Sequence, residues 1–163
     1  KPGMEIRKAK TKAKFYAEKS GLPTIADDGG LEVDALGGAP GVKSHRWIHG
    51  DREDSDEELI AHTIKQLQGI PVGHRQAQLR AVLALVLPDG KVFTAGSVSK
   101  GMIPLKPAEH RSEGFPYRSL LFIPEINKFY DHTLLTEEEN DRYNHRKQAL
   151  EKLKPIIKKY AGH

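Results

Sequence analysis

The chain has 163 residues, about the length of one domain, and its 26 basic and 22 acidic residues give a formal net charge of +4. This charge is too small for a strongly basic, nucleic-acid-binding surface, and the absence of cysteine excludes disulfides, thiolate metal sites and thiol nucleophiles. No apolar run approaches the roughly 18 residues of a membrane span. We therefore expect a soluble cytoplasmic domain over residues 1–163, with neither a membrane nor a nucleic-acid partner.

The first predicted element is an amphipathic helix over residues 6–19. Its apolar residues recur every three to four positions: Ile6, Ala9, Ala13 and either Tyr16 or Ala17. We interpret the lysines around this stripe as a solvated face rather than an anion-binding patch. A short buried strand over residues 23–26 follows, and it leads into Asp27-Asp28-Gly29-Gly30.

The middle of the chain combines a loop, a helix and a hairpin. Glycine and proline in residues 34–50 favour a shaped loop. Ser55 and Glu58 then form a capping box, which predicts a helix whose buried face carries Ile60, Ile64 and Leu67. Two apolar runs, over residues 77–87 and 91–98, flank the turn Pro88-Asp89-Gly90 and predict a β-hairpin.

The last third holds a long loop and two helices. The loop, over residues 101–124, includes the aromatic segment Gly114-Phe115-Pro116-Tyr117-Arg118. Thr136 and Glu139 form a second capping box, and Asn144 can cap a final helix that Pro155 should kink. The predicted buried face of that helix is Leu150, Leu153, Ile157 and Tyr160. Helices and strands therefore alternate, which predicts the α/β class.

Asp27 and Asp28 are the first candidates for chemistry. The two glycines that follow them let the backbone turn tightly and let a ligand approach closely. Because neighbouring side chains on a strand point in opposite directions, the pair is not expected to chelate one ion symmetrically. One carboxylate can bind a divalent ion while the other orients or deprotonates a water molecule. An acidic turn that uses Asp and Gly for their backbone preferences is an equal alternative.

Two further pairs are candidates for ligand contacts. His145 and Arg146 fall in the first turn of the final helix, where backbone N–H groups and the helix dipole favour an anion or a carbonyl oxygen. The alternative is a solvated basic pair. Phe115 and Tyr117 can offer a stacking face to a nucleobase, or they can be core aromatics beneath a loop.

These motifs, taken in order, resemble the inosine triphosphate pyrophosphatase family. The segment from Ser20 to Arg46, SGLPTIADDGGLEVDALGGAPGVKSHR, is similar to the family's Gly-Leu-Pro, Asp-Asp-Ser-Gly-Leu, Gly-Gly-Ala-Pro-Gly and Ser-x-Arg segments. Gly114-Phe115-x-Tyr117 resembles its Gly-Phe-Gly-Tyr-Asp loop, and Asn144-His145-Arg146 resembles its Ser-His-Arg. The resemblance extends from about Gly3 to the C-terminus.

The resemblance implies an α/β fold in which a mixed sheet forms two lobes, with flanking helices and a central cleft. It also implies a homodimer that uses Mg²⁺ to hydrolyse purine nucleoside triphosphates of the ITP, dITP and XTP type. The products are the monophosphate and pyrophosphate, so such nucleotides are removed from the cellular pool. Arginine carries only donors, which suit a 6-oxo purine and disfavour the 6-amino group of adenine.

The resemblance assigns expected roles to the residues that match the family's motifs. Asp28 is the expected general base on the attacking water, and Asp27 and Asp28 are the expected metal ligands. Six residues are expected to bind substrate: Lys12 near the phosphates, Gly29, Phe115 stacked on the base, Tyr117, and His145 with Arg146 at the 6-oxo edge.

The chain also departs from the family pattern. Arg7 and Lys8 replace a Glu-Asn pair whose glutamate helps to hold the metal, Gly29 replaces a serine, and four replacements lie further on: Pro116, Arg118, Asn140 and Asn144. The family's opening strand and phosphate loop do not precede Gly3, so we expect the single domain to be N-terminally incomplete. These departures support an alternative function, a catalytically impaired family member that binds nucleotides or acts as a scaffold.

Overall fold

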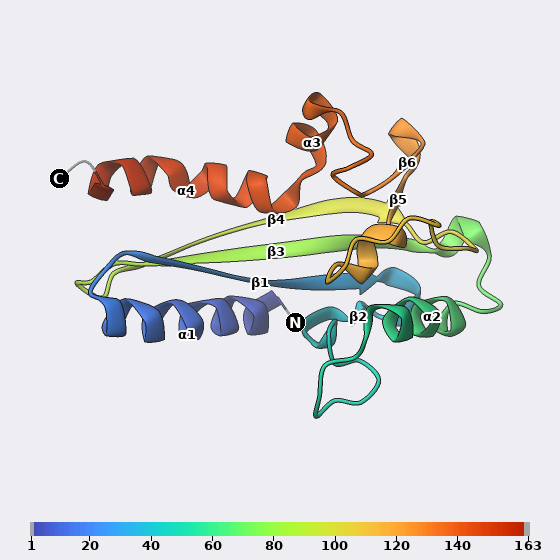
Figure 1. The fold of residues 1–163 in the computed structure, drawn as a ribbon, viewed down its shortest axis with the longest axis horizontal. Helices are drawn as coiled ribbons and strands as arrows, with labels where there is room; N and C mark the ends of the chain where they lie inside the picture. The colour runs from blue at the N-terminus through green and yellow to red at the C-terminus, as the bar shows by residue number, and fades with distance from the viewer. Residues whose placement is uncertain (1, 162–163) are drawn as a thin grey trace. The chain divides into compact units, whose positions relative to one another are not determined.

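A computed structural model describes residues 2–161 of the chain (Figure 1). The described helices are α1 (Pro2–Ser20), α2 (Asp56–Gln66), α3 (Glu137–Tyr143) and α4 (His145–Ala161). The described strands are β1 (Thr24–Val33), β2 (Ala39–Pro40), β3 (Gln76–Val86), β4 (Val92–Met102), β5 (Phe122–Ile123) and β6 (Lys128–Phe129). They form one sheet in the order β2-β1-β3-β4-β5-β6, which confirms the α/β class.

Strand pairing in this sheet is antiparallel for β1 with β2, β4 with β5, and β5 with β6. The predicted β-hairpin is present as β3 and β4, joined by the turn at residues 88–90. Within residues 2–161, no helix is both long enough and apolar enough to cross a membrane.

The described chain forms two compact units. The first unit contains α1, residues 24–29 of β1, residues 80–98 of the β3–β4 hairpin, and α4. The second unit contains residues 30–79 and 99–143. Three of the boundaries between the units fall inside strands, one each in β1, β3 and β4. Each of these three strands therefore contributes residues to both units.

Helices cover both faces of the strands in the first unit (Figure 1). Helix α1 packs through Ala9, Ala13 and Ala17 against Ala84 and Val86 of β3. The predicted stripe is confirmed with Ala17, and the alternative with Tyr16 is wrong because the Tyr16 ring is exposed. Alanines carry no bulk beyond Cβ, so the helix axis can lie close to the sheet.

Helix α4 covers the opposite face of β3, where Ala149 and Leu153 pack with Leu83 and Leu85 of the strand and with Leu87 directly after it. The sequence placed Leu150 on the buried face, which is wrong, because Ala149 is fully buried and Leu150 is exposed. The helix continues through Pro155 to Ala161.

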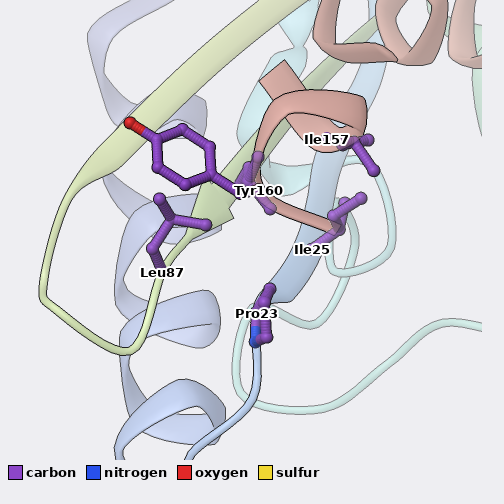
Figure 2. A pocket seen from close by; sticks show the side chains of 6 residues that line it. Pro23, Ile25, Leu87, Ile157 and Tyr160 are labelled. Atoms are coloured by element: carbon purple, nitrogen blue, oxygen red, sulfur yellow. The ribbon is translucent and has the colours of Figure 1, made fainter. Parts of the chain in front are cut away.

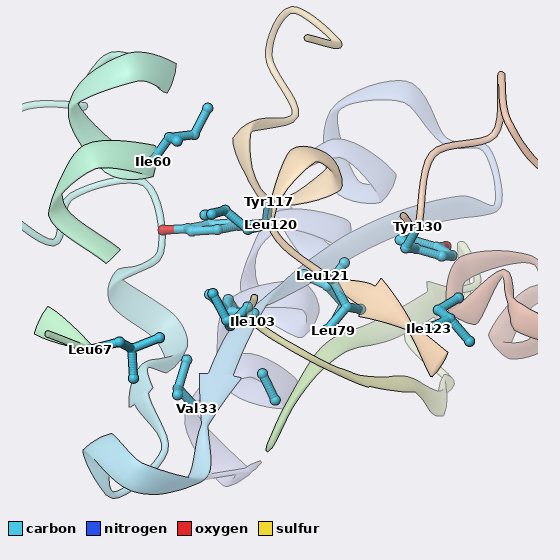
Figure 3. Close-up of a cluster of buried hydrophobic side chains, with 12 residues drawn as sticks. Val33, Ile60, Leu67, Leu79, Ile103, Tyr117, Leu120, Leu121, Ile123 and Tyr130 are labelled. Carbon is cyan, nitrogen blue, oxygen red and sulfur yellow. The ribbon is translucent and has the colours of Figure 1, made fainter. Parts of the chain in front are cut away.

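The second unit has its own apolar core, drawn from β1, α2, β3 and the segment around β5 (Figure 3). Its buried members include Leu31, Ile60, Leu67, Ile103, Tyr117 and Leu121. Helix α2 begins at the predicted capping box, since Ser55 Oγ accepts from the Glu58 N–H and Glu58 Oε2 accepts from the Ser55 N–H.

Strand β1 is longer than the sequence predicts. It was expected to end at Ala26, with a tight turn at Gly29 and Gly30, but the strand continues to Val33. Glycine is needed at these two positions for another reason. A Cβ atom on Gly29 would overlap the backbone carbonyl oxygen of Arg80, and one on Gly30 would overlap that of Gly41. Glycine therefore serves close approach of a neighbouring backbone here, rather than a turn.

Candidate active site

Asp27 and Asp28 lie side by side in β1 and face opposite sides of the first unit's sheet. Arg146 of α4 donates from Nε to Asp27 Oδ2 at 2.9 Å. Lys12 of α1 places Nζ 4.0 Å from Asp28 Oδ1. The side chain of Asp27 is 49% exposed and that of Asp28 is 17% exposed. The expected opposite orientation of the two carboxylates is thus present.

The environment of Asp28 favours proton uptake. Burial raises the pKa of the Asp28 carboxyl and the nearby Asp27 charge raises it further, while Lys12, Lys8 and the Gly29 N–H lower it. The net result is a raised pKa. Asp28 Oδ2 is buried and has no hydrogen-bond partner among the described residues. A carboxylate with a raised pKa and a spare oxygen is suited to general-base chemistry or to ion binding.

Lys12 connects the two aspartates. Besides its approach to Asp28, its Nζ donates to the backbone carbonyl oxygen of Asp27 at 3.3 Å. Lys8 lies one helical turn before Lys12 on α1, and its charge reaches Asp28. The structure therefore brings together Lys12, Asp27, Asp28 and Arg146, four of the predicted site residues, in the first unit. We call them the aspartate cluster.

The donor set of the aspartate cluster fits magnesium in chemical type. Magnesium prefers oxygen ligands and is usually bound through one or two carboxylates. The buried Asp28 Oδ2 is an oxygen donor without a described partner. Asp27 adds a second, half-exposed carboxylate, one oxygen of which is bonded to Arg146.

The start of α4 agrees with the predicted cap. The helix begins at His145, and Asn144 Oδ1 accepts from the Lys147 N–H at 3.0 Å. His145 is buried, whereas Arg146 is exposed and reaches Asp27. Gly29, also a predicted substrate contact, lies in β1 with its Cα against the Arg80 backbone.

The two predicted aromatic contacts lie in the second unit and differ in exposure. Phe115 is 42% exposed, and the Arg118 guanidinium carbon lies 3.8 Å from its ring centroid. Tyr117 is buried, its hydroxyl donates to the Ser44 carbonyl oxygen, and burial raises its pKa. The alternative of a core aromatic beneath the loop describes Tyr117, while Phe115 retains an accessible face for stacking.

Sequence reasoning missed one buried carboxylate beside this loop. Asp131 is 2% exposed, and it accepts hydrogen bonds from Ser112 Oγ at 2.6 Å and from Thr133 Oγ1 at 2.8 Å. The only sequence signal is an Asp two positions before a Thr, which is common in turns of many kinds.

A second group of potential metal ligands in the second unit is already satisfied internally. His49, Asp54 and Glu58 bring ligand atoms within 4.8 Å of one another. Asp54 accepts from the backbone N–H of Ile48 and from His49 Nδ1, at 2.8 and 2.5 Å, and Arg52 contacts His49 Nε2 at 2.9 Å. These bonds order the loop before α2.

An apolar pocket of about 120 Å³ lies in the first unit (Figure 2). Its lining is Pro23, Ile25, Leu85, Leu87, Ile157 and Tyr160. Apart from the Tyr160 hydroxyl these side chains carry no polar group, so the pocket offers little to a phosphate.

The sequence is similar to a known protein family and to named relatives. The profile of the Ham1 family matches residues 5–156. A protein of Corynebacterium efficiens named dITP/XTP pyrophosphatase is 39% identical over 158 residues, covering 93% of this chain and 73% of the relative. A Thermus thermophilus protein of the same name is 39% identical over 149 residues, covering 91% of this chain and 68% of the relative.

Solved structures agree with these relatives. A HAM1 protein from Coxiella burnetii superposes with a TM-score of 0.77 at 29% identity, covering 93% of this chain and 75% of that one. A nucleoside-triphosphatase, dITP/XTP pyrophosphatase, from Mycobacterium abscessus gives a TM-score of 0.70 at 36% identity, covering 89% and 73% of the two chains.

Proposed function

Since the chain belongs to the Ham1 family, we propose that it hydrolyses purine nucleoside triphosphates of the dITP and XTP type to the monophosphate and pyrophosphate. The observation that carries the proposal is the aspartate cluster. It joins a largely buried carboxylate of raised pKa, a second carboxylate and two cations within one unit. Beyond the sequence departures named above, no contact or distance among the described residues favours an impaired family member.

Asp28 acts as the general base. Its raised pKa makes it a stronger proton acceptor than an ordinary aspartate, and Oδ2 has no competing hydrogen-bond donor among the described residues. The water oxygen bonds to the α-phosphorus while the bond to the bridging oxygen of the leaving pyrophosphate breaks. The water proton passes to Asp28, and the Lys12 ammonium group offsets phosphate charge.

Asp27 and Asp28 are the proposed Mg²⁺ ligands, and because their side chains face opposite sides of the sheet they would not chelate one ion symmetrically. When bound, Mg²⁺ would supply charge neutralisation at the phosphate oxygens. Recognition of the base belongs to the remaining residues. In the second unit, Phe115 offers a stacking face to a purine. In the first unit, the donors of His145 and Arg146 suit a 6-oxo group. An adenine amino group there leaves a buried donor facing a donor, which costs about 1–3 kcal/mol. The proposal includes a homodimer in the cytoplasm.

Pyrophosphate release from dITP, XTP and dATP, with and without Mg²⁺, tests this proposal. We expect release from dITP and XTP with Mg²⁺, slower release from dATP, and a loss of about 10²- to 10⁴-fold in Asp28→Asn. Asp89→Asn makes the same chemical change in the β3–β4 turn, where Asp89 pairs with Lys91, and should keep the wild-type rate.

Two outcomes would contradict the proposal. Equal rates in Asp28→Asn and the wild type would remove Asp28 as the base. No release from any nucleotide, together with a melting temperature that rises when nucleotide is added, would favour the binding or scaffold alternative.

A further inference from the structure

The loop that carries Phe115 is anchored by three carboxylates of the second unit. Asp56 Oδ2 accepts from the Gly114 N–H at 2.7 Å, and Glu57 Oε1 accepts from Arg111 Nε at 2.6 Å. Both acceptors belong to the first turn of α2, where Asp56 is half-buried and Glu57 is exposed. Asp131 Oδ2 accepts from Ser112 Oγ at 2.6 Å, and it alone of the three is buried.

Asp131 is itself held in a fixed orientation. Its Oδ1 accepts from both the N–H and the Oγ1 of Thr133, at 2.9 and 2.8 Å. Its Oδ2 is thereby directed toward Ser112. Burial raises the pKa of Asp131, but hydrogen bonds from Ser112 and Thr133 and the charge of Arg118 outweigh burial and lower it. The carboxylate is therefore an ionised, strongly bonded acceptor at neutral pH.

The residue after Asp131 reaches the other end of the loop. Arg118 Nη1 lies 2.7 Å from His132 Nδ1, and because arginine can only donate, the imidazole nitrogen accepts. The carbon of the same guanidinium lies over the Phe115 ring, 3.8 Å from its centroid. Asp131 and His132 thus hold the loop at Ser112 and at Arg118.

Phe115 lies between these two attachment points. Its N–H donates to the Ser112 carbonyl oxygen at 2.9 Å, and its own carbonyl oxygen accepts from the Arg118 N–H at 3.1 Å. The ring projects from a short segment that is fixed on both sides while it remains 42% exposed. A shift of Ser112 would therefore also shift the Phe115 ring.

We infer that Asp131 is a positioning residue for nucleotide binding, which holds the Phe115 ring ready to stack on the purine through Ser112. The inference rests on the proposed function, in which Phe115 contacts the base. Stacking stabilises the bound substrate and the transition state equally. Weaker stacking therefore raises KM and leaves kcat unchanged.

Steady-state kinetics with XTP test the role. We expect Asp131→Asn and Ser112→Ala to raise KM about tenfold and to change kcat less than twofold. Asp89→Asn, with the same change outside the loop, should leave both constants at wild-type values. Ser112→Ala keeps the buried carboxylate and its Thr133 bonds, so it tests the attachment without altering Asp131 itself.

Limited trypsin digestion gives a readout that needs no activity, because Arg111 and Arg118 lie at the two ends of the loop. We expect both variants to be cut at these residues several times faster than the wild type. Unchanged cleavage, or faster cleavage with an unchanged KM, overturns the inference.

The measurements distinguish failure of the proposed function from failure of the role inferred for Asp131. If the wild type releases no pyrophosphate, the proposed function fails, and the affinity for inosine monophosphate by calorimetry takes the place of KM. A weaker affinity together with faster cleavage in the variants would still support Asp131 as a positioning residue, and equal affinity would overturn it.

Discussion

Asp27 and Asp28 are neighbours in sequence with different surroundings. Asp27 is half exposed and pairs with a guanidinium, whereas Asp28 is largely buried and lies 4.0 Å from an ammonium group. Alternation along an extended strand is enough to produce this difference. This difference is consistent with the roles we propose, in which Asp28 accepts the proton and Asp27 is the more accessible oxygen ligand.

The raised pKa of Asp28 predicts how activity depends on pH. If Asp28 is the general base, as we propose, its carboxylate must be deprotonated to act, so activity should fall as the pH drops through a value above the pKa of an ordinary aspartate. Lys12→Met removes a charge that lowers this pKa, so the acid limb of kcat/KM against pH should move to higher pH. Lys14→Met, on the same helix, should leave the limb in place. A limb unchanged by Lys12→Met would contradict this assignment.

Some residue roles cannot be read from sequence because they depend on distant partners. Arg146 meets Asp27 across 119 positions, and Asp131 meets Ser112 across 19. Phe115 and Tyr117 belong to one motif, yet only the folded core shows that Tyr117 is buried and Phe115 is exposed. The motif identified the Asp27-Asp28 pair, but no local pattern marks Asp131 as a partner of the aromatic loop.

At the scale of elements, β1 shows why glycines follow the two aspartates. The strand passes so close to Arg80 and Gly41 that neither Gly29 nor Gly30 has room for a Cβ atom. The serine that the family pattern carries at position 29 would not fit this backbone without a shift. The departure from the pattern thus has a local steric cause.

Gly29→Ala tests this explanation. The added Cβ meets a backbone carbonyl oxygen, which cannot rotate away, so the free energy of unfolding should fall by about 1–3 kcal/mol or more. Urea denaturation followed by circular dichroism measures the loss. Gly73→Ala is the matched control, because a Cβ there has nothing within 4 Å. Equal midpoints for the two variants would refute the steric explanation.

The starts of the capped helices are the features that the sequence predicts best. The caps at Ser55, Thr136 and Asn144 depend on hydrogen bonds that span three residues, so their signal is contained in the local sequence. The end of β1 depends on pairing with other strands. Glu32 and Val33 pair with Pro40 and Ala39 of β2, and the other neighbour of β1 is β3, which begins at Gln76. The continuation of β1 beyond Ala26 could not be inferred from the residues next to it.

At the scale of the whole molecule, the two compact units share three strands. Because β1, β3 and β4 contribute residues to both, loss of either unit disturbs strands of the other. We therefore expect the two units to unfold in one cooperative step, as most small single domains do. The apolar clusters are separate, but the backbone that carries them is continuous.

Leu153→Ala tests this coupling. Leu153 is buried in the first unit, and its truncation should cost about 2–5 kcal/mol. Trp47, the single tryptophan, lies in the second unit with its ring 4.8 Å from that of His62, so its fluorescence reports unfolding there. We expect the fluorescence and circular dichroism midpoints to fall together. A fluorescence midpoint that stays at the wild-type value would show that the units unfold independently.

The packing of α4 on β3 also has a consequence for synthesis. Leu83, Leu85 and Leu87 leave the ribosome long before Ala149 and Leu153, which cover them in the folded protein. Throughout that interval the nascent chain presents an apolar strand, which is the kind of segment that aggregates or binds a chaperone. The Asp27–Arg146 pair can form only after Arg146 has been translated, so the aspartate cluster is completed well after Asp27 and Asp28 have been made.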